Sequence, residues 1–164
     1  MKNILITGGA GFIGSAIAER LISLEYNITI LDNLSSKIHD NRNIYDKLKK
    51  KTNFFIGDIN VRKDWENAIL DQDAIIHLAA ETGTGESMYD IYNYTNTNVS
   101  ATALMLDVLT NSQHKVKKIL LGSSRAVYGE GMYKCKEQGV VFPSCRKNKD
   151  LKAVSYTHLR AHET

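Results

Sequence analysis

The sequence predicts an α/β fold in which a parallel sheet carries helices on both faces. Two observations support this prediction. Five short apolar runs, rich in Ile, Leu and Phe, alternate with segments of helical periodicity. The runs show little alternation of apolar and polar residues, as expected of strands that are covered on both sides. Such a sheet is doubly wound, with right-handed crossovers between its strands.

Each apolar run predicts one strand. In chain order these are Asn3–Thr7, Asn27–Leu31, Asn53–Gly57, Ala74–Ala79 and Lys117–Ser123. Beyond Gly129 the pattern fades into glycines, charges and the only proline. We therefore expect the sheet to be truncated after about the fifth strand.

Three segments between the strands have helical spacing. The first places one apolar face on Ile13, Ile17, Leu21 and Leu24. The second, Val61–Leu70, has an inward face formed by Trp65, Ala68 and Ile69. The third, Asn98–Leu109, carries on one side Val99, Thr102, Leu106 and Leu109.

Composition limits the function classes. The 164 residues have room for one domain with a core, and 43% are hydrophobic. A net charge of +3 without a basic stripe argues against nucleic-acid binding. No apolar stretch predicts a membrane span or a signal peptide. Two cysteines, Cys135 and Cys145, predict free thiols in the cytoplasm, and no metal site is expected. The role of these cysteines stays open.

The segment TGGAGFIG, Thr7–Gly14, follows the first strand and opens the first helix. In this context its glycines predict a phosphate cradle of the Rossmann type. Gly8 allows a tight turn, Gly11 allows close approach of a pyrophosphate, and Gly14 allows the helix to lie near the sheet. The same letters also fit a pattern that begins at Gly9, so spacing alone does not choose between the two.

The residues that end the second strand select the cofactor. Asp32 lies near the expected distance of about 20 residues from the glycine turn, where a carboxylate accepts hydrogen bonds from the adenosine ribose. It would repel a 2′-phosphate, and Asn33 supplies no positive charge. We therefore expect NAD rather than NADP. Residues 1–130 are predicted to form a partial NAD-binding domain, 131–152 a loop or insertion, and 153–164 a non-native tail.

An ordered set of motifs resembles the extended short-chain dehydrogenase/reductases. It comprises TGGAGFIG, DNLSS, GDI, HLAA, NTNVSAT and SSRAVYG. More narrowly, AAETGTGESMY with SSRAVYGEG resembles NAD-dependent nucleotide-sugar epimerases of the UDP-glucose and dTDP-L-rhamnose 4-epimerase type. The resemblance implies transient oxidation of the sugar C4 by NAD, a nucleotide-sugar substrate, and a homodimer as the intact enzyme. Which nucleotide sugar is bound stays open.

The resemblance also implies roles for single residues. Ser124 would be the catalytic serine, and Glu81, Thr82 and Gly83 would border the sugar. The implied cofactor contacts are Phe12 and Ile13 at the pyrophosphate, Asp58 and Ile59 at the adenine, Leu78, Ala79 and Ala80 along the channel, and Asn98 at the nicotinamide side. We expect His77 to be a hydrogen-bonded imidazole at a strand end rather than a base.

Two further positions distinguish reactions within this family. Sugar dehydratases resemble one another in placing an Asp-Glu pair after the catalytic hydroxyl residue, where this chain has Arg125 and Ala126. Neither side chain can do carboxylate acid–base work, so epimerisation is favoured over dehydration. A reductase of the same fold and a non-catalytic NAD-binding sensor remain alternatives.

The family's base is a tyrosine with a lysine four residues on. Tyr156 and Arg160 have this spacing, but no amphipathic helix surrounds them, and the last eleven residues differ in character from the rest. We therefore do not expect Tyr156 to act as the base. The sequence predicts an N-terminal fragment that binds NAD weakly and does not epimerise, because the helix that would carry the Tyr-x-x-x-Lys pair after the fifth strand is missing.

Overall fold

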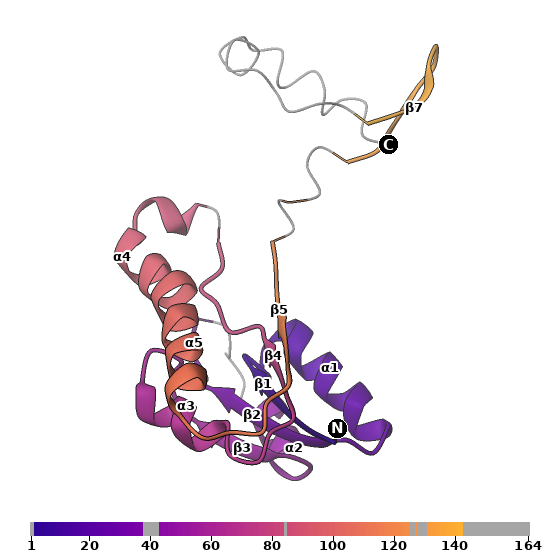
Figure 1. Cartoon of the computed structure of the whole chain (residues 1–164). Coiled ribbons are helices and arrows are strands. Elements are labelled where there is room, and N and C mark those ends of the chain that lie inside the picture. Colours follow the sequence, from indigo (N-terminus) through magenta and orange to yellow (C-terminus); the bar gives the residue numbers. More distant parts are fainter. Residues whose placement is uncertain (1, 38–42, 84, 125–126, 128–130, 143–164) are drawn as a thin grey trace. The chain divides into compact units, whose positions relative to one another are not determined.

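A computed structural model describes residues 2–37, 43–83, 85–124, 127 and 131–142 (Figure 1). The chain forms two compact units, Met1–Gly122 and Ser123–Thr164. Each unit is described by itself below.

The first unit contains a parallel sheet of five strands in the order β3-β2-β1-β4-β5. The strands are β1 (Asn3–Thr7), β2 (Asn27–Asp32), β3 (Asn53–Ile56), β4 (Ala74–His77) and β5 (Lys118–Leu121). The chain moves outward from β1 to β3 and then returns to the other side of β1. The strand order therefore reverses between β1 and β4, which is where doubly wound sheets bind their ligands. All five predicted strands are confirmed: the first has the predicted bounds, and the ends of the others differ by at most two residues.

Helices cover both faces of the sheet. They are α1 (Phe12–Ser23), α2 (Asn43–Lys49), α3 (Arg62–Ala68), α4 (Ile91–Thr95) and α5 (Ala101–Asn111), with the short turns η1 (Glu86–Met88) and η2 (Asn96–Ser100). Alternate residues of β1 enter two separate cores. Ile4 and Ile6 pack with residues of α1 and α2, whereas Leu5 packs with residues of α3 and α5. This division confirms the doubly wound α/β fold.

Two helices bury only part of the face predicted for them. Ile17 and Leu21 of α1 pack against the core as predicted. Ile13 and the C-cap Leu24 are exposed by 61% and 49%, while Gly14 and Ala18 are buried. The helix lies on the sheet through these small residues, because they permit the closest approach.

The third predicted helix is also confirmed in part. Leu109 packs against the core as predicted, whereas Val99 and Leu106 are exposed by 62% and 50%. The buried residues of α5 are Ala101, Met105 and Val108. In the second predicted helix the whole prediction is confirmed, since Trp65, Ala68 and Ile69 are each at most 1% exposed.

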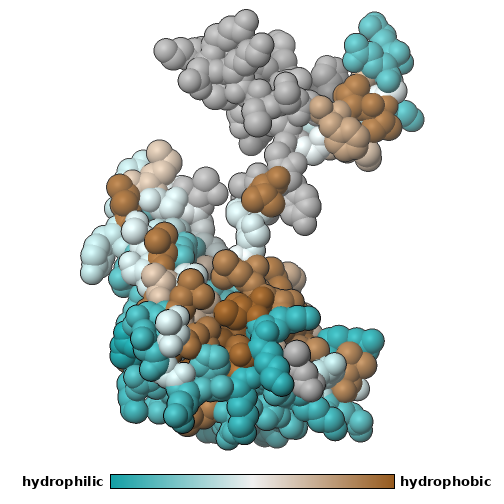
Figure 2. Space-filling model, in the orientation of Figure 1, coloured by the Kyte–Doolittle hydropathy of each residue, from teal (hydrophilic) through white to brown (hydrophobic). Residues whose placement is uncertain are grey.

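The sequence did not predict α2, α4 or a hairpin in the second unit. That hairpin pairs β6 (Tyr133–Cys135) with β7 (Gly139–Val141) in antiparallel register, inside the segment expected to be a loop or insertion. In the first unit, β5 is an edge strand with exposed apolar residues, and Figure 2 shows apolar side chains gathered over this side of the sheet. Within the described ranges, no helix is long and apolar enough to cross a membrane.

Candidate functional site

The predicted site residues of the first unit follow four strands at one edge of the sheet. The glycine turn follows β1, Asp32 ends β2, Asp58 follows β3, and Leu78 follows β4. Parallel strands end at the same edge, so the fold brings these four loops together. The sequence motifs, although distant along the chain, therefore meet at the point where the strand order reverses.

The glycine turn has two positions that only glycine can occupy. Gly8 has a φ of +67°, and a Cβ there would lie 2.7 Å from the backbone nitrogen of Ala79. At Gly14 a Cβ would lie 2.2 Å from the carbonyl oxygen of Gly8. Gly11 differs, because its φ is −69° and its nearest such contact is 3.2 Å, again to the Gly8 oxygen. The fold therefore requires Gly8 and Gly14, while the backbone places a weaker constraint on Gly11, whose role toward a ligand stays a prediction.

The start of α1 has the features of an anion site. Gly11 is its N-cap, no side chain caps it, and its first turn carries no acidic residue. Phe12 and Ile13 are exposed by 94% and 61% at this end. The first backbone N–H groups of a helix have no intrahelical partner and favour a negative ligand.

Asp32 braces the glycine turn from the end of β2. Its Oδ2 accepts a hydrogen bond from the Ala10 N–H at 2.9 Å, and its Oδ1 accepts one from the Leu34 N–H at 2.9 Å. The side chain is buried at this position. Asp32 therefore shapes the turn in addition to any role toward a ribose.

The ends of β2 and β3 are joined by polar side chains. Asn33 Nδ2 donates to Asp58 Oδ2 at 3.3 Å, and Asp58 Oδ1 accepts from the Asn60 N–H at 2.8 Å. Ile59 is only 6% exposed, and its carbonyl oxygen accepts a hydrogen bond from Trp65 Nε1 at 2.7 Å. The Ile59 side chain thus belongs to the core. Of the two residues predicted at the adenine, Asp58 is the one whose side chain lies outside the core.

His77 ends β4 inside a chain of hydroxyl groups. Its Nδ1 lies 2.7 Å from Thr7 Oγ1, and its Nε2 lies 3.4 Å from Thr102 Oγ1. Thr7 Oγ1 also accepts the N–H groups of Leu78 and Ala79, each at 3.2 Å, so its own proton is directed to His77. The neutral ring then carries its proton on Nε2. Burial lowers the pKa of His77 to about 4.

This arrangement confirms the prediction of a hydrogen-bonded imidazole. Thr102 continues the chain by donating to the Asn98 carbonyl oxygen at 3.1 Å. The network connects the end of β1 to η2 and α5 without presenting a base to a substrate.

Asn98 holds the segment that follows β4. Its Nδ2 donates to the Glu81 carbonyl oxygen at 3.0 Å, and its Oδ1 accepts from the Glu81 N–H at 2.8 Å. Asn98 lies in η2, a π-helical turn at the entry to α5, and such turns occur often at functional sites. Both ends of its amide are engaged with backbone, so it positions the Leu78–Glu81 segment along the predicted channel.

Three residues to which the sequence analysis gave no role, Lys37, Glu86 and Tyr94, hold the segment that follows β4. Tyr94 places its hydroxyl 2.8 Å from the Thr82 carbonyl oxygen and 3.2 Å from Glu86 Oε2. Lys37 Nζ lies 2.6 Å from Glu86 Oε1. Burial, followed by Glu86, raises the pKa of Tyr94, so this phenol stays protonated at neutral pH. In the sequence, the only feature that could have indicated this group is Lys37, a basic residue that directly follows the DNLSS motif.

Ser124 belongs to the second unit. The Val127 N–H donates to its carbonyl oxygen at 3.2 Å. Several positions of interest lie outside the described residues, namely Arg125, Ala126, Cys145, Tyr156 and Arg160. The catalytic role of Ser124 stays a prediction.

The spacing Tyr-x-x-x-Lys does occur elsewhere, at Tyr45 and Lys49 of α2. The Tyr45 ring packs edge-on against Phe54 at a centroid distance of 4.9 Å. The Lys49 ammonium lies 5.3 Å from the centre of the Tyr45 ring. Since these residues pack α2 onto β3, this pair is structural.

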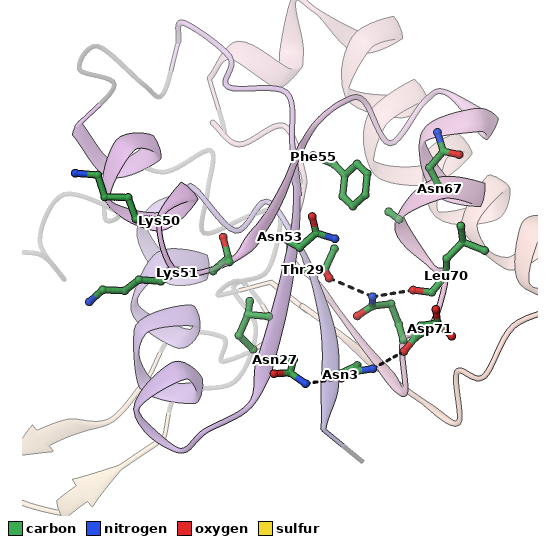
Figure 3. Close-up of a pocket in the computed structure, with 14 residues that line it drawn as sticks. Asn3, Asn27, Thr29, Lys50, Lys51, Asn53, Phe55, Asn67, Leu70 and Asp71 are labelled. Atoms are coloured by element: carbon green, nitrogen blue, oxygen red, sulfur yellow. Dashed lines mark hydrogen bonds between the residues drawn. The ribbon is translucent and has the colours of Figure 1, made fainter.

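A cavity of about 630 Å³ opens at the opposite edge of the sheet (Figure 3). It is lined by the first residues of three strands, Asn3, Asn27 and Asn53. Figure 3 shows Lys50 and Lys51 pointing away from Phe55. No predicted site residue lines this cavity, so it is separate from the glycine turn. Among the residues the structure describes, no group of three His, Cys, Asp or Glu side chains could hold a metal ion.

Comparison with known proteins gives one family. The model of the NAD dependent epimerase/dehydratase family matches residues 4–145. A dTDP-L-rhamnose 4-epimerase from Burkholderia thailandensis is 39% identical over 157 residues, which cover 94% of this chain and 43% of that protein. A UDP-glucose 4-epimerase from Neisseria meningitidis is 35% identical over 136 residues, covering 79% of this chain and 39% of its own length.

Solved structures agree with this. A UDP-glucose 4-epimerase from Stenotrophomonas maltophila with bound NAD and formylated UDP-arabinopyranose has a TM-score of 0.69 and 27% identity, covering 79% of this chain and 39% of that one. A dTDP-glucose 4,6-dehydratase from Streptomyces venezuelae with NAD has a TM-score of 0.67 and 30% identity, covering 77% and 40%. The chain thus spans about two fifths of the length of the proteins it matches.

Proposed function

Because the chain belongs to the NAD-dependent epimerase/dehydratase family, we propose that it forms the dinucleotide-binding portion of a nucleotide-sugar 4-epimerase. The observation that carries this is the glycine turn between β1 and α1. It lies where the strand order reverses, it is braced by Asp32, and the first turn of α1 beside it carries no acidic residue. The pyrophosphate of NAD would bind at the start of α1, with the adenosine ribose toward Asp32.

NAD would supply hydride acceptance at C4 of the sugar and its later return. The residues of this chain would bind and orient the reactants. Asn98 would hold the Leu78–Glu81 segment along the nicotinamide side, and Ser124 would hydrogen-bond the sugar hydroxyl that is oxidised. Thr82 and Gly83 would border the sugar, in a loop held by Tyr94.

The nucleotide-sugar substrate, the homodimer and the cytoplasmic location belong to this proposal. The similarity to UDP- and dTDP-sugar epimerases supports the nucleotide-sugar substrate. Exposed apolar residues along α4, η2 and α5 support the homodimer, namely Tyr92, Val99 and Leu106. We expect binding of NAD without epimerase turnover by this chain, since the Tyr-x-x-x-Lys pair among the described residues, Tyr45 and Lys49, packs within α2 and against β3.

A titration with NAD⁺, followed by calorimetry, tests the cofactor. We expect saturable binding that is weaker for NADP⁺, because Asp32 repels a 2′-phosphate. The Gly11→Ala variant should fold, since its added methyl meets only the Gly8 oxygen at 3.2 Å, yet bind NAD⁺ more weakly by obstructing the pyrophosphate. Gly85→Ala is the matched control, because a Cβ there meets nothing within 4 Å. Equal binding by all three proteins would contradict the proposed site.

Turnover is tested separately with NAD⁺ and UDP-galactose or dTDP-rhamnose. We expect no interconversion of the sugars. Conversion that disappears in Tyr156→Phe would show that this tyrosine acts as the base after all.

A further inference from the structure

The loops that follow β1 to β4 carry little positive charge in the residues that the structure describes. Within 7–12, 33–37, 57–61, 78–83 and 85–90, Lys37 is the one lysine or arginine. A dinucleotide brings a pyrophosphate with two negative charges. The glycine turn offers backbone N–H groups but no charged side chain, so Lys37 is the cation that the described residues of these four loops offer to an anion.

Lys37 lies between the two loops that flank the glycine turn. It belongs to the loop after β2, and its ammonium contacts Glu86, which follows β4, at 2.6 Å. In the sheet, β2 and β4 are the two neighbours of β1. This side-chain pair therefore joins the loops of the two strands that lie on either side of β1, the strand that leads into the glycine turn.

Lys37 can exchange its contact with Glu86 for another partner at little cost in free energy. The two side chains are 49% and 47% exposed, and ion pairs at this exposure are screened by water and contribute little. A hydrogen bond from an ammonium to a phosphate is among the stronger polar contacts. Glu86 keeps a second contact, with the Tyr94 hydroxyl at 3.2 Å, so its carboxylate has a partner when Lys37 turns away.

The loop after β4 would otherwise repel an anion. Glu81, Glu86 and Asp90 all act on the Lys37 ammonium, with Glu86 contributing most. Without Lys37, these three carboxylates would face a pyrophosphate with no nearby cation among the described loop residues.

We propose that Lys37 binds the pyrophosphate of the dinucleotide, exchanging its contact with Glu86 for one with a phosphate oxygen. This inference rests on the proposed NAD site and adds a residue that the glycine and Asp32 motifs do not contain. Lys37 would neutralise the acidic loop and draw the loops after β2 and β4 toward the bound ligand.

Calorimetric titrations of the whole chain with NAD⁺, ADP-ribose and adenosine test this inference. For Lys37→Met we expect about tenfold weaker binding of NAD⁺ and ADP-ribose, as for loss of one charge-assisted hydrogen bond. Binding of adenosine, which has no phosphate, should not change. Higher salt should weaken NAD⁺ binding less in Lys37→Met than in the unchanged chain.

Two further variants sharpen the test. Lys47→Met removes a lysine of comparable exposure, 57%, that pairs with Glu19 at 2.5 Å on α1 and α2, and it should bind NAD⁺ normally. Glu86→Gln keeps a partner for Tyr94 but releases Lys37, so its NAD⁺ affinity should be equal or a few-fold higher.

The outcomes separate the two proposals. NAD⁺ binding that is equal in the unchanged chain and in Lys37→Met overturns the inference alone. A loss that extends equally to adenosine also overturns it, because the defect would then be structural. If the unchanged chain binds no NAD⁺, the proposed function fails, and the inference fails with it.

Discussion

Acidification should destabilise this fold through His77. Burial lowers the pKa of the folded imidazole to about 4, whereas the ordinary value is 6.5. The unfolded chain therefore takes up a proton on this ring below about pH 6.5, and the folded chain does so only near pH 4. Stability is thus complete above about pH 7 and declines as the pH falls from 6.5 toward 4.

The magnitude follows from the difference in pKa. A shift from 6.5 to about 4 corresponds to roughly 3 kcal/mol when complete. Between pH 7.5 and pH 5.0 the same linkage gives a loss of about 2 kcal/mol. The physical cause is burial of the ring, since His77 is only 3% exposed. The Thr7 hydroxyl, 2.7 Å from Nδ1, donates to the neutral ring.

Urea unfolding at the two pH values measures this effect. The fluorescence of Trp65, the only tryptophan, reports the transition because its side chain is fully buried and lies 5.6 Å from the His77 ring. His77→Asn retains an acceptor toward Thr7 and does not titrate. It should be less stable at pH 7.5 through lost packing, but its further loss at pH 5.0 should be about 2 kcal/mol smaller.

Carboxylates also titrate in this range, so the comparison between variants isolates His77. His114→Asn serves as the control, since His114 is an exposed histidine whose Nε2 lies near the Leu109 carbonyl oxygen. It should keep the full pH dependence. If His77→Asn loses as much stability on acidification as the unchanged chain, the reasoning from burial is wrong.

Three further substitutions probe the site and the sheet edge. Gly14→Ala should lower the free energy of unfolding by about 2 kcal/mol and abolish NAD⁺ binding, because its methyl would lie 2.2 Å from the Gly8 oxygen; urea titration and calorimetry measure both. Asn98→Ala should cost about 1 kcal/mol and speed amide exchange at Glu81, since two hydrogen bonds to that backbone are lost. Leu121→Lys should reduce aggregation in light scattering without lowering stability, because the Leu121 side chain is 60% exposed on the edge strand.

Each of these predictions has its own contrary outcome. An unchanged melting temperature in Gly14→Ala would mean that the turn relaxes without cost. Unchanged exchange at Glu81 would remove the positioning role of Asn98. Aggregation that persists in Leu121→Lys would mean that the molecules associate through another apolar surface, for example the one with Val99 and Leu106, which are 62% and 50% exposed.

The five strands, three of the helices between them and the position of the glycine turn could be predicted because each depends on local chemistry. A parallel strand that is buried on both faces needs a continuous apolar run, and a turn with positive φ at Gly8 needs glycine. Local patterns also located the residues that follow each strand. They did not reveal α2 or the hairpin of β6 and β7, because these elements are short and lack a clear hydrophobic period.

Contacts between distant segments were decided only by the tertiary structure. Periodicity identifies a helix, but the sheet decides which side is buried, and in α1 the small residues Gly14 and Ala18 take that side in place of Ile13. The pairing of Lys37 with Glu86 joins residues 49 apart, and that of His77 with Thr7 joins residues 70 apart. Such pairs form because parallel strands end at one edge of the sheet, whereas a sequence pattern records only near neighbours along the chain.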